Sequence, residues 1–63
     1  MWRYKVSMRD VVTRKERTVH GESHETKTLA YNELIIWLEH KFANMFVGRD
    51  NERILEAKVE EIE

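Results

Sequence analysis

The sequence contains no cysteine, no proline and only two glycines among its 63 residues. Without cysteine the chain forms neither a disulfide nor a thiolate metal site. Its apolar runs fall far short of the roughly 20 residues that a membrane-spanning helix needs. Residues 1–9 alternate polar and apolar side chains. A secretory signal has a continuous apolar segment instead, so we do not expect these residues to form one. These absences predict a soluble intracellular protein with no membrane partner.

The short chain limits the core that it can build. Sixty-three residues predict one small domain, residues 1–63, which buries a smaller fraction of its surface than a larger domain does. Small scaffolds are usually stabilised by disulfides, by a metal or by oligomerisation. Because cysteine is absent, oligomerisation remains, and we expect a homodimer.

The charges are unevenly distributed along the chain. The formal net charge is −1, but residues 1–20 carry six Lys/Arg and two Asp/Glu, whereas residues 43–63 carry three and six. In one interpretation the basic beginning and the acidic end neutralise each other across a sheet. In another, one of these segments contacts a charged partner.

The first half of the chain predicts two strands. From Trp2 to Met8, large apolar residues alternate with polar ones, as in a half-buried strand. The alternation breaks beside Asp10, where we expect a bulge or the strand end. Residues 13–16 are the expected turn. Residues 17–28 are polar and rich in threonine, which predicts a second strand at the sheet edge.

A helix is predicted over residues 29–47, with Thr28 as its N-cap and Gly48 as the left-handed residue that ends it. At about 100° per residue, one broad apolar stripe contains Tyr31, Leu34, Ile35, Leu38, Phe42, Met45 and Phe46. Within this stripe we expect Leu34, Leu38 and Phe42 in the core. Ile36 lies nearly opposite the stripe and Trp37 lies beyond its edge, so we predict that these two belong to an interface.

The last segment, residues 53–63, fits either a strand or a helix. As a strand, it turns Leu55, Ala57 and Val59 toward the core. As a helix, it lines up Leu55, Val59 and Ile62. The strand is favoured because a two-stranded hairpin is marginal and a third strand makes a sheet that one helix can cover. The predicted fold is therefore α+β, a ββαβ chain whose three-stranded antiparallel sheet is packed by one long helix.

Side chains for catalysis or for metal binding are few. His20 and His24 have a metal-binding spacing only on a helix, since on a strand they lie about 13 Å apart. Neither Ser7 nor Ser23 lies in an oxyanion-hole motif, no carboxylate pair stands out, and both glycines are isolated. We expect no enzymatic activity, no metal and no cofactor.

The basic first strand supports an alternative function. β-Ribbons enter the DNA major groove, and six cations precede residue 20: Arg3, Lys5, Arg9, Arg14, Lys15 and Arg17. The stretch Trp2–Val6 also resembles the arm-type DNA-binding domains of some phage integrases. The acidic end and the negative net charge oppose phosphate binding, which makes nucleic acid the less favoured partner.

Three stretches resemble the small uracil-DNA glycosylase inhibitors of certain Bacillus phages. They are Tyr4–Met8, the helical residues Lys27–Leu29 and Glu33–Leu38, and Glu52–Leu55 with Val59–Ile62. Members of that family are short ββαβ homodimers that mimic DNA and occupy the DNA-binding cleft of the host repair enzyme. Their dimer forms an apolar pocket for the enzyme's minor-groove leucine. The resemblance implies uracil-DNA glycosylase as partner and the host bacterial cytoplasm as location.

The resemblance also implies roles for single residues. The two aromatic residues that line the family's pocket fall at Leu34 and Leu38, which are not aromatic here. Trp37 is the nearest aromatic residue and takes that role instead. The longer helix and the basic first strand also differ from the family. The implied partner-binding residues are Leu34, Ile36, Trp37, Leu38, Glu22, Glu25, Glu56 and Glu60, with Glu61 and Glu63 adding negative charge. The implied dimer residues are Ile35, Ile36, Trp37 and Val59.

The leading hypothesis is therefore a homodimeric, phage-type inhibitor of uracil-DNA glycosylase. The alternative is a small DNA-binding accessory protein of a phage or mobile element that uses the N-terminal hairpin.

Overall fold

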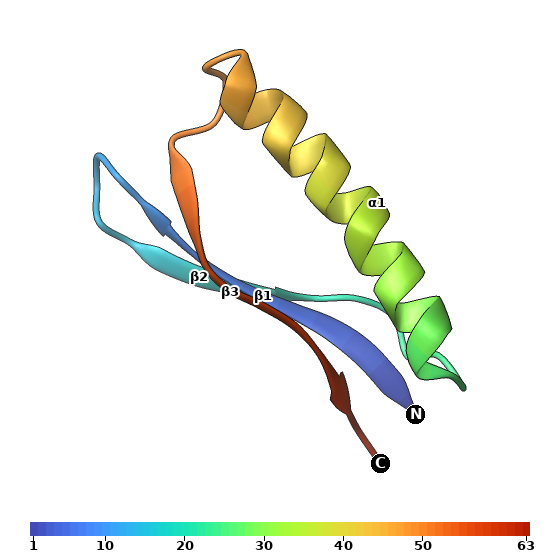
Figure 1. Ribbon diagram of the computed structural model, residues 1–63. Coiled ribbons are helices and arrows are strands. Elements are labelled where there is room, and N and C mark those ends of the chain that lie inside the picture. The colour runs from blue at the N-terminus through green and yellow to red at the C-terminus, as the bar shows by residue number, and fades with distance from the viewer.

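The first strand lies at the centre of the sheet. The computed structural model describes all 63 residues, in the order β1 (Trp2–Asp10), β2 (Glu16–His20), α1 (Lys27–Phe46) and β3 (Glu52–Glu61). Both β2 and β3 pair with β1 in antiparallel orientation, so the strand order is β2-β1-β3, and α1 crosses one face of the sheet (Figure 1). This arrangement confirms the predicted ββαβ fold, including the extended conformation of the last segment.

The second strand is shorter than predicted. Only Glu16–His20 pairs with β1, whereas the prediction extended the strand to residue 28. After His20 the chain makes an isolated backbone bridge between His24 and Trp2 and then enters α1. Threonine content indicated extended structure, but two of these threonines belong to the beginning of the helix.

The core is built on the alternation of β1. Tyr4, Val6 and Met8 are buried together with Leu34 of α1, and five partly buried side chains pack around them: Val19, Trp37, Leu38, Ile54 and Val59. The opposite side of β1 carries the polar residues of the pattern. The period-two prediction for β1 is confirmed.

A bulge in β3 changes which of its apolar residues face α1. The register passes from Ser7 opposite Glu56 to Met8 opposite Ile54, so Leu55 has no partner on β1. Opposed residues of an antiparallel pair share a face, which places Ile54 beside Met8 in the core. Leu55 is 48% exposed, so the prediction that it faces the core is wrong.

The helix begins two residues before its predicted start. Thr26, not Thr28, is the N-cap, with extended backbone angles and an Oγ1 that accepts a hydrogen bond of 3.2 Å from the Leu29 N–H. Gly48 adopts a φ of 75°, as predicted for the residue that ends the helix. The N–H groups of Gly48 and Arg49 donate to the carbonyls of Met45 and Asn44, which completes a Schellman motif.

The helix packs through a different face from the predicted stripe. Its least exposed residues are Ala30, Glu33, Leu34, Trp37, Leu38, Lys41 and Met45. Leu34 and Leu38 are in the core as predicted, but Phe42 is 52% exposed, which contradicts its predicted core position. Trp37, predicted to lie outside the core, packs against it, because its ring lies on that of Tyr4. The helix is thus rotated toward Trp37, and one side of the predicted stripe faces away from the sheet.

Candidate functional site

A cavity lies between α1 and the segment that follows β2. Its volume is about 530 Å³, and it is lined by Tyr4, His20, Gly21, Glu22, Glu33, Ile36, Trp37 and His40. The helix lies over β1 and β3 rather than over β2, which leaves this side of the sheet less covered (Figure 1). We call this space the loop cavity. It brings together three residues that the sequence predicted to bind a partner: Glu22, Ile36 and Trp37.

Two aromatic rings form the apolar part of the loop cavity. The ring centroids of Tyr4 and Trp37 are 6.1 Å apart and the ring planes are tilted by 40°, a favourable arrangement for an aromatic pair. Burial, and secondly the nearby carboxylate of Glu33, raises the pKa of the Tyr4 hydroxyl. The phenol therefore stays neutral, and the cavity carries its negative charge on Glu22 and Glu33.

Glu33 fixes the segment between β2 and α1. Its Oε1 accepts a hydrogen bond of 2.9 Å from the Glu22 N–H, and its Oε2 lies 3.2 Å from His24 Nε2, without the angle of a hydrogen bond. The backbones of Trp2 and His24 exchange two hydrogen bonds of 2.7 Å. One carboxylate on the helix and one backbone bridge therefore shape this wall of the cavity.

Gly21 is required where the segment passes between the helix and β1. Its N–H donates to the Tyr4 carbonyl at 3.0 Å. A Cβ at this position would overlap both the Tyr4 ring and the Glu33 carboxylate. No other residue type fits without displacing one of these two groups, so the glycine sets how closely the segment approaches the helix.

A second, smaller hollow continues along the helix. It has a volume of about 220 Å³ and is lined by Arg17, Trp37, His40, Lys41, Asn44 and Asp50. Trp37 and His40 belong to both cavities. The two hollows thus follow the same side of α1, and the character of the lining changes from acidic and aromatic to mixed in charge.

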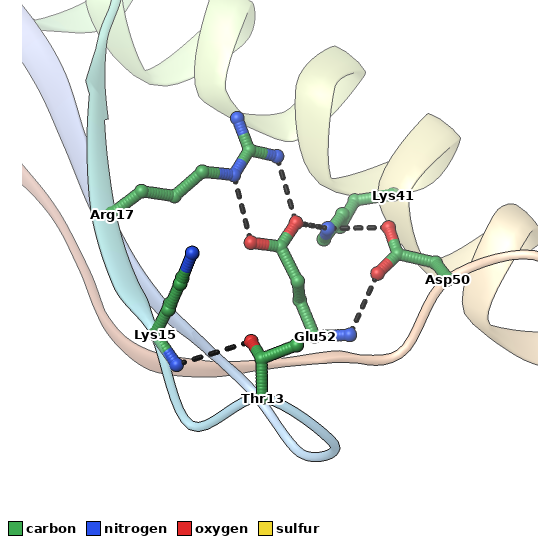
Figure 2. A network of polar contacts seen from close by, with 6 residues as sticks. All are labelled: Thr13, Lys15, Arg17, Lys41, Asp50 and Glu52. Carbon is green, nitrogen blue, oxygen red and sulfur yellow. Dashed lines mark hydrogen bonds and ion pairs between the residues drawn. The ribbon is translucent and has the colours of Figure 1, made fainter.

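Four charged side chains close the far end of this hollow, and we call them the charge network (Figure 2). Arg17 Nε and Nη2 donate to the two Glu52 oxygens at 2.7 and 2.8 Å. Lys41 Nζ donates to Glu52 Oε1 at 2.8 Å and also to Asp50 Oδ2. The network therefore connects β2, α1, the loop after α1 and β3, and it keeps a lysine that is only 6% exposed fully paired.

The electrostatics of the charge network favour its ionised state. Hydrogen bonds from Arg17 and Lys41 lower the pKa of Glu52 to about 2, and the hydrogen bond from Lys41 also lowers the pKa of Asp50. Burial alone would lower the pKa of Lys41, but the hydrogen bonds to Asp50 and Glu52 outweigh it, and this pKa is raised. All four groups are therefore charged at neutral pH.

The basic first third is partly neutralised by the acidic last third. Arg3 contacts Glu60 at 3.2 Å and Arg17 contacts Glu52, both across the sheet, while Arg9 contacts Glu16 at 3.0 Å. The first interpretation of the charge asymmetry is thus supported for two of the six cations, Arg3 and Arg17, whereas Arg9 pairs with a carboxylate of the first third. The other three, Lys5, Arg14 and Lys15, have no carboxylate within ion-pair distance.

The proposed partner-binding residues are divided between core and surface. Leu34 is buried and Leu38 packs against the core, so neither presents a side-chain surface like that of Ile36, which is 58% exposed. Trp37 is half-buried between the core and the loop cavity. The glutamates Glu22, Glu25 and Glu56 are exposed. Glu60 is half-buried beside Arg3.

The proposed dimer residues are divided in the same way. Ile35 and Ile36 are exposed, whereas Val59 faces the helix from β3 and packs against the core. Sequence reasoning grouped several residues that are exposed in the structure into one apolar stripe, and it placed one of them, Phe42, in the core. These are the members of what we call the helix stripe: Tyr31, Ile35, Phe42 and Phe46. The sequence signal for their exposure is the number of large apolar residues on the helix. One short three-stranded sheet cannot cover seven of them.

The structure contains neither a cluster of metal ligands nor a helix suited to cross a membrane. No three His, Asp or Glu side chains are grouped closely enough to hold a metal ion. No helix combines the length and apolarity that crossing a bilayer requires.

Comparisons with protein-family models, with curated proteins and with solved structures give no match to this chain.

Proposed function

We propose that the chain is a homodimeric protein inhibitor that occupies the DNA-binding cleft of bacterial uracil-DNA glycosylase. The observation that carries the proposal is the helix stripe, whose four large apolar side chains lie outside the core of a 63-residue protein. Phe46 is 91% exposed and Phe42 is 52% exposed. Contiguous apolar surface of this kind marks a protein interface.

The helix stripe and the loop cavity lie on nearly opposite sides of α1. At about 100° per residue, positions 31, 35, 42 and 46 fall within roughly 60° of one another. The cavity positions 33, 36, 37 and 40 are centred roughly 160° away. A dimer formed through the helix stripe therefore leaves the loop cavity open to another protein. We assign the stripe to the dimer and the cavity side to the target.

Negative charge gathers at one end of the molecule, beside the loop cavity. Trp2 pairs with His24 on one side and with Glu61 on the other, which places the segment after β2 and the end of β3 on either side of β1 (Figure 1). The carboxylates there that have no cation within ion-pair distance form what we call the acidic end: Glu22, Glu25, Glu61 and Glu63. An unpaired acidic surface is what a basic DNA-binding cleft attracts.

A uracil-excision assay tests the proposal. We expect stoichiometric inhibition of uracil release from a uracil-containing oligonucleotide. We also expect that the double substitution Glu22→Gln and Glu25→Gln weakens inhibition at least tenfold, because it removes half of the acidic end. Glu16→Gln, at the exposed beginning of β2, is the control and should inhibit as the wild type does. No inhibition at micromolar concentration would refute the proposed target.

Light scattering tests the dimer separately. We expect a mass twice the 7.7 kDa of one chain. Ile35→Asp places a charge in the helix stripe and should give monomers, whereas Asn32→Asp adds the same charge outside the stripe and should leave the dimer intact. A wild-type monomer at high concentration would contradict the assignment of the stripe.

One observation favours DNA binding as a second candidate. Arg14 and Lys15 lie at the turn between β1 and β2, are exposed and have no carboxylate partner, and Arg14 adopts a positive φ of 64°. In a gel shift with a salt titration, duplex binding that weakens steeply with salt would support this function. The absence of a shift at low salt would exclude it.

A further inference from the structure

We propose that the loop cavity binds the guanidinium side chain of an arginine presented by the partner protein. This inference rests on the proposed function, because DNA-binding clefts contact phosphates largely through arginine and lysine. The cavity volume of about 530 Å³ lies in the range of small-ligand sites. It is therefore large enough to admit one long side chain from a second molecule.

The lining of the cavity matches an arginine along its length. A guanidinium is planar and stacks on aromatic faces, and Trp37, backed by the buried Tyr4 ring, supplies an aromatic surface in the lining. Ile36 is an apolar neighbour for the aliphatic part of an arginine side chain. Glu22 and Glu33 provide carboxylates for the fork of N–H donors. Two aromatics and two carboxylates in one cavity form a cation site.

The charge of the lining excludes other classes of side chain. No lysine or arginine lines the cavity, so an acidic side chain would meet two carboxylates, with the imidazoles of His20 and His40 as the only basic groups in the lining. An apolar side chain would remove water from those carboxylates without replacing their hydrogen bonds, which is costly. Lysine supplies a compact charge but no plane to stack on an aromatic ring. The guanidinium of arginine is both planar and charged, so it can contact the aromatic surface and the carboxylates of the cavity.

One of the two carboxylates is already held in place. Glu33 accepts the Glu22 N–H and lies against His24, so its position is set before any ligand arrives. Each of its oxygens keeps a second acceptor position. The Glu22 carboxylate has no cation within ion-pair distance and is exposed. We assign Glu33 as the fixed contact and Glu22 as the contact that an arginine recruits.

A titration with N-acetyl-arginine amide tests the site without the enzyme. Trp2→Phe leaves Trp37 as the one tryptophan, so its fluorescence reports the cavity. We expect a dissociation constant on the order of 1 mM, the range that ligand efficiency allows for so small a molecule. The citrulline analogue, which has the same shape without the charge, should bind at least tenfold more weakly. The experiment is run at pH 8.

Matched variants locate the contact. Glu22→Gln should weaken arginine binding at least fivefold, whereas Glu25→Gln, in the same segment but outside the lining, should not. If N-acetyl-leucine amide binds as well as the arginine compound, or if no compound changes the fluorescence of Trp37, the inference is wrong. Arginine binding without inhibition of the glycosylase would remove the proposed target and leave the cavity site standing. Inhibition of the glycosylase without arginine binding would refute the cavity site and leave the proposed target standing.

Discussion

Glu52 is the residue whose replacement tests the stability argument most directly. It accepts hydrogen bonds from Arg17 and Lys41 and its side chain is only 16% exposed. Glu52→Gln keeps the shape of the side chain and removes its charge. The substitution leaves Lys41 paired with Asp50 alone and deprives Arg17 of its carboxylate. Weakening a buried ion network from one side is destabilising because the remaining charges stay desolvated.

The lowered pKa of Glu52 gives the size of the stability loss expected for Glu52→Gln. A value of about 2 in place of 4.5 corresponds, at 1.36 kcal/mol per pKa unit, to about 3 kcal/mol in favour of the folded, ionised protein. Arg17 is 54% exposed, and solvent screens its part of the interaction, so we expect a loss of about 2 kcal/mol at pH 7. For a domain of this size that loss lowers the melting temperature by about 8–16 °C.

The pH dependence has a defined sign. The pKa of Glu52 is lowered on folding, so its contribution is complete above the unfolded value of 4.5 and is lost as the pH falls toward 2. The lowered pKa of Asp50 acts in the same direction. The difference in free energy of unfolding between wild type and Glu52→Gln should therefore be largest above pH 5 and nearly vanish at pH 2.

Urea unfolding at several pH values, followed by circular dichroism, measures this difference. Glu56→Gln is the control, because Glu56 is exposed and its contact with Lys58 is 3.6 Å long, so it should change stability by less than about 0.5 kcal/mol. Two results would refute the reasoning. One is a Glu52→Gln variant as stable as wild type at pH 7, and the other is a loss that persists unchanged at pH 2.

Three further substitutions test local features of the fold by denaturant unfolding. Gly21→Ala should cost about 1–3 kcal/mol, because its Cβ overlaps Tyr4 and Glu33, and wild-type stability would contradict the close approach. Thr26→Ala should cost about 1 kcal/mol and Thr28→Ala less than about 0.5 kcal/mol, and the reverse order would restore Thr28 as the N-cap. Ile54→Ala should cost about 2 kcal/mol or more and Leu55→Ala much less, since the bulge places only Ile54 in the core; equal losses would argue against the bulge.

Local patterns predicted the elements of the fold but not the bulge. The alternation of β1 and the left-handed Gly48 are visible in the sequence because each depends on residues within a few positions. The face of β3 is different, since one extra residue at Leu55 exchanges the inward and outward sides for the rest of the strand. Nothing within residues 53–63 marks that position, because Ile54 and Leu55 are equally apolar.

The rotation of the helix was also beyond the sequence. The predicted stripe was chosen by greatest apolar content, which gave Phe42 to the core and Trp37 to the surface. The structure selects the side that includes Lys41, because Asp50 and Glu52 neutralise its ammonium and its long chain packs beneath the helix. A pattern that scores lysine as polar cannot find this face, since its partners lie 9 and 11 residues farther along the chain.

The candidate site shows the same division between local and distant information. Ile36, Trp37 and Glu22 were singled out from the sequence, and they do meet at the loop cavity. Tyr4, Gly21 and Glu33 were not, because their role depends on how closely the segment after β2 approaches the helix. That distance depends on Gly21 and on a backbone bridge between Trp2 and His24, and no spacing in the sequence reveals either contact.

The arrangement of charge supports the first interpretation of the sequence asymmetry along the sheet and leaves the second, contact with a charged partner, as a proposal. Along the sheet, Arg3 and Arg17 meet Glu60 and Glu52, so opposite charges cancel where strands pair. At the acidic end no cation lies within ion-pair distance of Glu22 or Glu25. Glu22, an unpaired carboxylate of the acidic end, therefore lies at the loop cavity. If the stripe joins two copies, the acidic end of each copy stays exposed to a basic partner. The dimer then has two partner-binding sites.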